Sequence, residues 1–340
     1  MTHPKLRKLH GLLQKALEVE LFTIPPYLTA LYSIDEGANR ASVEILQSVV
    51  MEEMLHAALV SNIMNAVGAA PQVQGASGTG KPRRVNYPAQ APHVARPLVI
   101  GLLPFSEKAV KGFAEIELPE DRTRWTTGAG FYSIGQLYDR IRNLMIAVTD
   151  ELGADQVFTG APRLQLFAKD YYLWRGGELM LVSGLDSALA AIDEIAQQGE
   201  GRLHSNLTGD EARFGQPKEV AHYYRFNQIL ERRFYDRDDD VRRPTGPRLI
   251  VDWKAVRPVG ALNPKTKLAR PPGVVAVLDA FTASYDELLT ALHEAFNGKK
   301  AQLMAAVPLM QRLKIQAIEV MRIDIGGGRT CPPPFWFMKS

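Results

Sequence analysis

The feature that most constrains this chain is a histidine that follows a glutamate by three residues, and it occurs twice, as Glu53-Met-Leu-His56 and Glu219-Val-Ala-His222. On an α-helix, positions i and i+3 lie about 4.5 Å apart along the axis and on nearly the same face. Each pair can therefore offer a carboxylate oxygen and an imidazole nitrogen to one point. Both pairs lie on apolar stripes, formed by Leu46, Val49, Val60 and Ile63 around the first and by Phe226 and Ile229 after the second. Buried charges in these positions need a partner.

Long amphipathic segments make up most of the chain. Residues 4–34 and 40–67 predict two helices joined by a polar turn, which is an antiparallel hairpin. Further helical patterns cover residues 133–152, 178–198, 218–234, 274–296 and 300–323. The sequence predicts a mainly α protein with one domain over residues 1–340, divided into a bundle core at 4–67 and 132–235, a long and partly extended insertion at 72–130, and a C-terminal extension of two helices at 274–325.

The neighbouring helices contain acidic residues on their apolar stripes as well. In the first helix Glu20 continues the stripe of Leu13 and Leu17, and in an antiparallel hairpin it lies level with Glu53. In the 178–198 segment the stripe leads to Glu200, whereas Glu194 points roughly 200° away from Ile192 at about 100° per residue. The sequence favours Glu200 and leaves Glu194 as the alternative.

Together these residues predict a metal centre formed by Glu20, Glu53, His56, Glu200, Glu219 and His222. One inward Glu from each of two helices and a Glu-x-x-His pair from each of two others is the dimetal arrangement of ferritin-like four-helix bundles. A surface contact or a structural histidine explains a single pair, but four inward glutamates without a cation are costly to bury. Oxygen and nitrogen donors without thiolate favour two non-haem iron ions, with manganese or zinc as alternatives.

Two consecutive prolines follow Glu20 within about one turn. Pro25 and Pro26 remove backbone donors and clash with the preceding turn, so we expect a kink or bulge there. Such a distortion opens a cavity for substrate or dioxygen near Pro25 and Tyr27, or else only bends the long helix over its neighbours. The sequence leaves both interpretations open.

Composition excludes several other classes of protein. The formal charge of +3 is spread along the 340 residues, which argues against nucleic acid binding. No apolar run approaches the roughly 20 residues that span a membrane, and the N-terminus lacks the pattern of a secretory signal. The single cysteine, Cys331, excludes an intrachain disulfide and a thiolate metal site. We therefore expect a cytoplasmic location.

The motifs resemble those of a known family. Leu17-Glu-Val-Glu20, Thr23-Ile-Pro-Pro-Tyr-Leu, Glu52-Glu-Met-Leu-His56 and Glu219-Val-Ala-His-Tyr-Tyr-Arg-Phe226 are similar to the ferritin-like, iminophenyl-pyruvate dimer synthase family. That family includes a domain of the large bisindole synthases of the violacein and rebeccamycin pathways, in which two imines derived from aromatic amino acids are oxidatively coupled. This chain lacks the several hundred additional residues of those synthases.

The resemblance implies an oxidative enzyme of secondary metabolism. Its substrate is a small amino-acid-derived molecule, its oxidant dioxygen or peroxide, and a biosynthetic enzyme is a candidate partner. Two other functions fit a ferritin-like bundle with a metal site, namely metal storage and a scaffold that has kept the fold without catalysis.

Overall fold

The structure is a computed structural model that describes residues 3–73, 85–119, 131–168, 177–200, 220–236, 239, 243–260 and 272–335. Over these residues the chain is mainly α-helical, and its few strands form two small antiparallel pairs, β1 (Ala89–Gln90) with β2 (Val99–Ile100) and β3 (Asp324–Gly326) with β4 (Arg329–Thr330). No described helix has both the length and the apolarity needed to cross a membrane.

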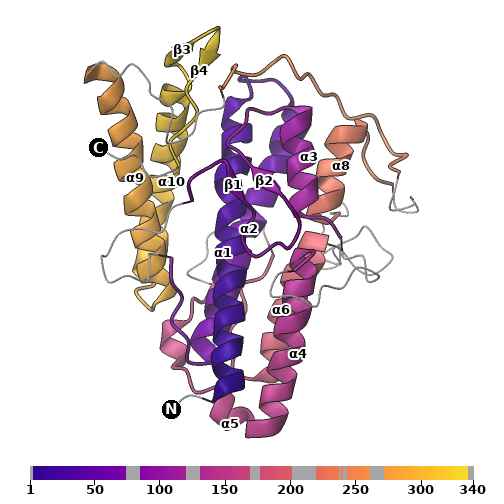
Figure 1. Cartoon of the computed structure of the whole chain (residues 1–340), viewed down its shortest axis with the longest axis vertical. Helices are drawn as coiled ribbons and strands as arrows, with labels where there is room; N and C mark the ends of the chain where they lie inside the picture. Colours follow the sequence, from indigo (N-terminus) through magenta and orange to yellow (C-terminus); the bar gives the residue numbers. More distant parts are fainter. Residues whose placement is uncertain are drawn as a thin grey trace.

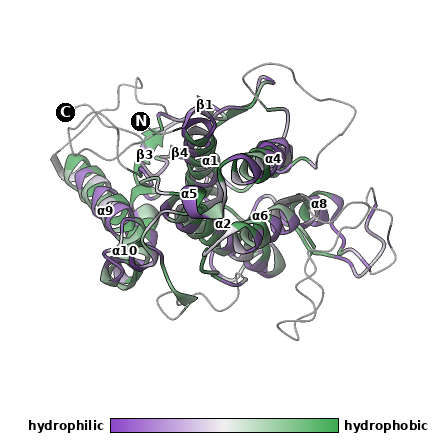
Figure 2. Cartoon of the chain, turned by 90° about the horizontal axis from the view of Figure 1, so that it is seen from below, coloured by the Kyte–Doolittle hydropathy of each residue, from purple (hydrophilic) through white to green (hydrophobic). Residues whose placement is uncertain are grey.

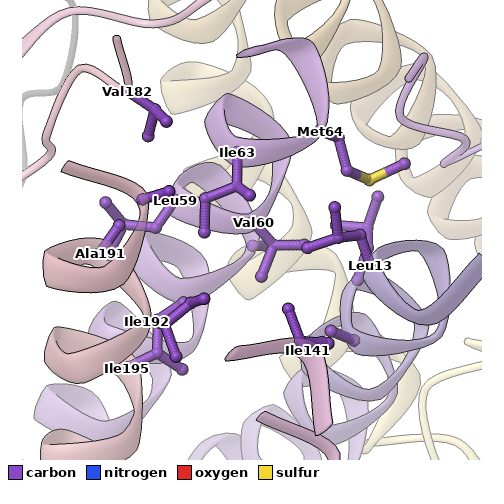
Figure 3. Packing of buried hydrophobic residues seen from close by; sticks show 14 of the residues in the cluster. Leu13, Leu59, Val60, Ile63, Met64, Ile141, Val182, Ala191, Ile192 and Ile195 are labelled. Carbon is purple, nitrogen blue, oxygen red and sulfur yellow. The ribbon is translucent and has the colours of Figure 1, made fainter. Parts of the chain in front are cut away.

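The backbone of the fold is a hairpin of two long helices, α1 (Pro4–Ser33) and α2 (Arg40–Ala66), whose bounds agree closely with those predicted from the sequence. The turn between them uses Gly37 and Asn39 with φ of 78° and 50°, a conformation that favours glycine and asparagine. Two more helices, α4 (Ile134–Leu152) and α6 (Leu185–Glu200), pack along the lower half of the hairpin. Apolar side chains of all four helices fill the space between them, as Figure 3 shows for Leu13, Val60, Ile141 and Ile192.

The upper half of the bundle is completed by two shorter helices that pack against each other, α3 (Glu107–Ile116) and α8 (His222–Glu231). In Figure 1 these lie above α4 and α6. Two helices of the bundle are therefore continuous, while the other two positions are each occupied by two shorter helices. The ends of α3, α6 and α8 come together around the middle of the hairpin, and this is where the candidate site lies.

The region interpreted as an extended insertion contains a helix that the sequence reading missed. Helix α3 begins at Ser106, whose hydroxyl accepts a hydrogen bond from the amide of Ala109, as a helix N-cap does. It buries Val110, Phe113 and Ile116 on one face. The prolines and glycines on either side of this segment obscured a pattern of only ten residues.

The predicted helix at 178–198 begins later, at Leu185. Its first residues are held as non-helical chain by side chains rather than by helical hydrogen bonds, because Asn62 donates to the carbonyl of Met180 and Gln165 donates to that of Val182. Between α4 and this segment lie two short elements, α5 (Ala154–Val157) and the 3-10 helix η1 (Pro162–Leu164).

Helix α1 is unbroken through Pro25 and Pro26, although we expected a kink or bulge there. Pro26 has no N–H to donate to the carbonyl of Phe22, four residues earlier. That carbonyl instead accepts a hydrogen bond of 2.6 Å from the hydroxyl of Tyr87. A side chain from the segment after α2 thus replaces a hydrogen bond that the proline removes, and the buried carbonyl keeps a partner.

The two C-terminal helices, α9 (Pro272–Phe296) and α10 (Ala301–Val320), form a second hairpin. Seen end-on in Figure 2, it lies on one side of α1 and α2, with α4, α6 and α8 on the other. Hydrogen bonds tie it down at both ends: Asn65 donates to the carbonyl of Phe296 at 2.8 Å, and the amide of Gly260 donates to Thr330 at 2.7 Å.

Candidate metal centre

Five buried side chains converge where the shorter helices meet the hairpin. None is more than 3% exposed, and they are Glu20 on α1, Glu53 and His56 on α2, Glu117 directly after α3, and His222 at the start of α8. They form two groups whose ligand atoms lie within 4.8 Å of one another, Glu20 with Glu53 and His56, and Glu53 with Glu117 and His222. Each group offers oxygen and nitrogen donors to one cation.

Glu53 belongs to both groups. Its two carboxylate oxygens can face two ions at once, which is how a carboxylate bridges a pair of metals. The first group comes entirely from the α1–α2 hairpin, and the second adds residues from α3 and α8. The rings of His56 and His222, one from each group, are stacked with their centroids 5.4 Å apart.

Glu117 is the member of the cluster that the sequence reading missed. It follows Phe113 by four residues and Val110 by seven, so it continues the apolar stripe of α3. The same test of facing direction that identified Glu20 would have found it, had the insertion been searched for short helices. Its Oε1 accepts a hydrogen bond of 2.6 Å from the hydroxyl of Tyr27.

The side chains of the predicted ligands from the end of α6 and from the segment before α8 lie outside what the structure describes. Glu219 lies outside the described residues, and Glu200 ends α6 with a side chain that is likewise not described. Glu194, the alternative, is half-buried and accepts a hydrogen bond of 3.1 Å from Gln198. Gln198, in turn, contacts His56, so Glu194 is one side chain removed from the cluster.

The two histidines are oriented in the same way. The Nε2 atom of His222 lies 2.9 Å from Glu52, and that of His56 lies 2.9 Å from the side-chain oxygen of Gln198. A proton on each Nε2 leaves the other ring nitrogen, Nδ1, as a lone pair toward the carboxylates: Nδ1 of His222 is 2.9 Å from Glu53, and Nδ1 of His56 is 3.3 Å from Glu20. Outer hydrogen bonds of this kind fix the tautomer of metal-binding histidines.

Glu52 is the second functional residue that the sequence reading passed over. It is 1% exposed and is held between His222 and Arg225, whose guanidinium lies 2.8 Å from its Oε1. Burial alone raises the pKa of a carboxyl group, but Arg225 and His222 outweigh burial and lower the pKa of Glu52. The carboxylate is therefore ionised and holds the His222 ring in place.

Hydroxyl groups orient the inner carboxylates. Thr23 donates a hydrogen bond of 2.7 Å to Glu53, and Tyr138 on α4 donates to Glu20. With the bond from Tyr27 to Glu117, each described carboxylate of the cluster has one neutral donor. These bonds restrict the carboxylate rotamers without supplying the positive charge that three buried acids need.

The cluster contains a nitrogen without a hydrogen bond and carboxylates without a compensating positive charge, and both fit a metal centre. In the described part of the chain, Nδ1 of His222 makes no hydrogen bond although it is buried and close to Glu53 and Glu117. Burial, together with the neighbouring charge of Glu117, raises the pKa of Glu53 to about 7. Divalent cations bound between these atoms would satisfy the nitrogen and compensate the carboxylates.

The raised pKa values predict that metal binding strengthens with pH. Below about pH 7 the metal-free protein holds a proton on Glu53. Burial opposes protonation of His56 and His222, but Glu20 raises the pKa of the first, and Glu117, Glu52 and Glu53 raise that of the second well above normal. Metal must displace these protons, so we expect the affinity for Mn²⁺ to rise about tenfold or more per pH unit up to pH 7 and to rise further above it.

Calorimetric titration with Mn²⁺ in two buffers of different ionisation enthalpy measures both affinity and proton release. The stability of the metal-free protein should instead fall with rising pH. A group whose pKa is raised on folding contributes stability that is lost as the pH rises through its pKa in the folded protein. An affinity independent of pH between 6 and 8 would contradict the assignment of these residues as ligands.

The large cavity of the described structure does not adjoin the metal cluster. It has a volume of about 990 Å³ and is lined by Pro25 but not by Tyr27, the two residues near which the sequence places a substrate cavity. Tyr27 is fully buried on the other face of α1, where it packs against Phe113 and Phe226 and bonds Glu117. The two residues are two positions apart on one helix, about 200° around its axis, and therefore face opposite sides.

Comparisons with known proteins agree with this geometry. Dichlorochromopyrrolate synthase of Lentzea aerocolonigenes is 25% identical over 331 residues, which cover 88% of this chain and 30% of that protein. The chain thus spans about a third of that relative's length. The crystal structure of a ferritin-like protein of Caulobacter vibrioides, solved at 1.95 Å, is similar to this fold with a TM-score of 0.64 and 24% sequence identity. The match covers 97% of this chain and 99% of that one. The sequence model of the ferritin-like family matches residues 13–231. As that match takes in well over half of the chain, the protein belongs to the ferritin-like family, as its motifs predicted.

Proposed function

We propose that this protein is a non-haem di-iron oxidoreductase that uses dioxygen or peroxide to oxidise a small amino-acid-derived molecule. The observation that carries the proposal is the pair of buried Glu/His groups that share Glu53. A structural site for one cation needs a single closed set of ligands, whereas two overlapping sets fit two ions joined by a carboxylate.

In this proposal Glu20, Glu53 and His56 hold one ion, and Glu53, Glu117 and His222 hold the other. Glu219, which lies outside the described residues, is a further candidate ligand of the second ion, but helix α8 begins at His222 and not at residue 218 as predicted, so the two residues do not share a helical turn. Glu200 is a further candidate ligand at the end of α6. Zinc is disfavoured because an oxidation requires a metal that changes its oxidation state, which iron and manganese both do, and iron is the one to be tested first.

Bound iron supplies electrons to the oxidant and so makes oxidation of an organic substrate possible. The chain supplies the rest. Glu52 and Gln198 keep the Nδ1 lone pairs of His222 and His56 directed at the centre. The aromatic packing of Tyr27 against Phe113 and Phe226 excludes water from one side, which strengthens the electrostatic interactions within the site.

The substrate class rests on the similar synthase from Lentzea aerocolonigenes. Its name denotes a chlorinated pyrrole product formed by a synthase, and the family that the sequence resembles couples imines of aromatic amino acids. We therefore propose an aromatic amino acid or its imine as the substrate. Oxidative coupling of two such imines is the specific reaction to be tested first.

The test is iron content followed by reaction with oxygen. Protein loaded anaerobically with ferrous iron should retain two ions per chain and change its optical spectrum when oxygen is admitted. We expect the His222→Ala variant to lose at least one ion and the spectral change. His10→Ala is a matched control, because His10 is a half-buried histidine whose Nε2 contacts the carbonyl of Val67, far from the cluster.

The outcomes separate the proposed classes. Uptake of many ions per chain would favour storage, and absence of bound metal in both proteins would favour a scaffold. Two ions and a spectral change without turnover of aromatic amino acids or their imines would keep the centre and reject the substrate class.

A further inference from the structure

The cavity of about 990 Å³ lies between the outer faces of α1 and α2 and the C-terminal hairpin of α9 and α10. The segment around Val85 and Tyr87 closes part of it. None of the five clustered metal-binding candidates lines it: Glu20, Glu53 and His56 belong to other faces of α1 and α2, and Glu117 and His222 come from α3 and α8. The backbones of these two helices therefore separate the cavity from the candidate metal centre.

The walls of the cavity are mainly apolar and include many aromatic and methionine side chains. Examples are Phe22, Tyr87, Tyr285, Phe335, Met54 and Met310. Methionine adapts to flat apolar surfaces, and aromatic rings stack on them. A volume near the upper end of the range for small-molecule sites, with apolar walls and a few polar groups, is typical of a ligand pocket.

The walls of this space are mainly apolar, and part of it is open to solvent. Water can fill it, but few wall groups can form hydrogen bonds with that water. A mostly apolar molecule would release this water and complete the packing between the two hairpins. The cavity thus favours an occupant with a large apolar body.

The polar groups of the lining are unevenly placed. The lining includes Arg257 near the end of α1, and Lys314 and Arg322 on and after α10; the last two side chains are exposed and have no ion-pair partner among the residues that the structure describes. Arg257 donates to the carbonyls of Tyr32 and Ile34. Arg40 lines the same end and pairs with Glu44, and the acids there are Asp35 and Glu36. Cations therefore outnumber acids at this end.

The phenol of Tyr32 adds a neutral donor to the same end of the cavity. Within the described ranges, no residue forms a hydrogen bond with its hydroxyl. Its surroundings are largely desolvated, and burial raises the pKa of Tyr32 far above normal, so the hydroxyl keeps its proton and can donate it. At the far end of the cavity the acid is Glu18, which His93 contacts at 2.9 Å. An anionic group would thus be favoured at the Tyr32 end and disfavoured at the Glu18 end.

We propose that this cavity is a second ligand site, which binds a monocarboxylate with an elongated apolar body. The body lies between Phe22, Met54 and Met310, and the carboxylate meets Lys314, Arg322 and the hydroxyl of Tyr32. The site is independent of the proposed metal chemistry, because α1 and α2 stand between them. Aromatic and aliphatic carboxylates can both bind in this way, and the aromatic side chains of the walls favour aromatic carboxylates.

Calorimetric titration of the metal-free full chain tests the proposal. The probes are 6-phenylhexanoate, decanoate, and 6-phenylhexanol as the uncharged analogue. We expect saturable binding of one ligand per chain, with the alcohol bound about tenfold more weakly than the phenyl acid. Decanoate binding as tightly as 6-phenylhexanoate would assign the site to fatty acids instead of aromatic acids.

Two variants locate the ligand. Met54→Trp fills the cavity and should abolish binding, whereas Ile315→Trp adds the same ring on the exposed side of α10, outside the lining, and should not.

The double variant Lys314→Gln/Arg322→Gln tests the charged end of the cavity. It should weaken binding of the phenyl acid about tenfold and leave binding of the alcohol unchanged. Arg312→Gln is the control for loss of a positive charge outside the cavity, since Arg312 also lies on α10 but pairs with Glu287 away from the lining.

Circular dichroism and thermal unfolding check that each variant is folded. Binding of the phenyl acid that is lost in Met54→Trp and retained in Ile315→Trp and His222→Ala supports the proposal. No saturable binding of any probe to the folded protein, or equal binding by Met54→Trp, overturns it. His222→Ala also separates this result from the proposed function, because that variant impairs the metal centre alone.

Discussion

Replacing Glu53 by glutamine is expected to remove both metal ions while leaving the metal-free protein at least as stable. Glu53 is the one residue common to the two Glu/His groups, so its loss takes an oxygen ligand from each ion. We expect the affinity for Mn²⁺ to fall more than about 100-fold at both positions. Mass spectrometry under native conditions would count the ions bound to each chain.

The pKa of Glu53 also predicts whether the metal-free variant is more or less stable than the metal-free wild type. The pKa of Glu53 is raised to about 7, so its negative charge is disfavoured in the folded protein. The free energy of unfolding of the metal-free wild type therefore falls as the pH rises through 7, by about 1–3 kcal/mol for this residue. Glutamine has no charge, so the variant should be the more stable of the two at pH 8. Urea unfolding at pH 6 and 8 measures the difference, and a metal-free variant that is less stable at pH 8 would show that Glu53 has a structural role.

The second large effect is expected for Arg225→Met. Arg225 is 4% exposed and supplies the positive charge beside Glu52, so the substitution leaves a carboxylate buried without its cation. Breaking a buried ion pair on one side costs about 3–5 kcal/mol. The loss should be largest at neutral pH, since the lowered pKa of Glu52 makes a contribution that exists above about pH 4.5 and disappears as the pH falls through the folded value.

The matched comparison for this substitution is the double variant Glu52→Gln/Arg225→Met, which removes both charges. Much of the lost stability should return in it, because no buried charge is left unpaired. Thermal unfolding of the wild type, both single variants and the double variant forms a complete cycle. Additive losses would mean that Arg225 stabilises the fold through its bonds to Ser48 and Val220 instead of through Glu52.

The hairpin and the candidate ligands on it could be predicted from sequence because every signal there is local. Glu20, Glu53 and His56 lie on long helices whose apolar stripes show which side chains face inward. Glu117 also continues an apolar stripe, but α3 has only ten residues, so the periodicity that marks it is short and no Glu-x-x-His pattern accompanies it. Its place beside His222 depends on how α3 packs against α8, a contact between residues about a hundred positions apart.

Glu52 shows a second reason why part of the candidate site could not be predicted from the sequence. The apolar stripe of α2 indicates that its sequence neighbour Glu53 faces inward. Adjacent residues on a helix point about 100° apart, so the same stripe predicts that Glu52 lies to its side. Its role depends on Arg225, 173 positions away. The cavity depends in turn on the C-terminal hairpin, whose helices the periodicity predicted but whose position against α1 and α2 it did not.

The two halves of the metal cluster differ in how much of the fold they require. Glu20, Glu53 and His56 all belong to one hairpin that is continuous through the middle of the protein. Glu117 and His222, in contrast, stand at the ends of short helices, next to connecting segments. Changes of length or sequence in those connections move one half of the cluster and leave the other in place. The position of the proposed second ion can therefore change during evolution while that of the proposed first ion is kept.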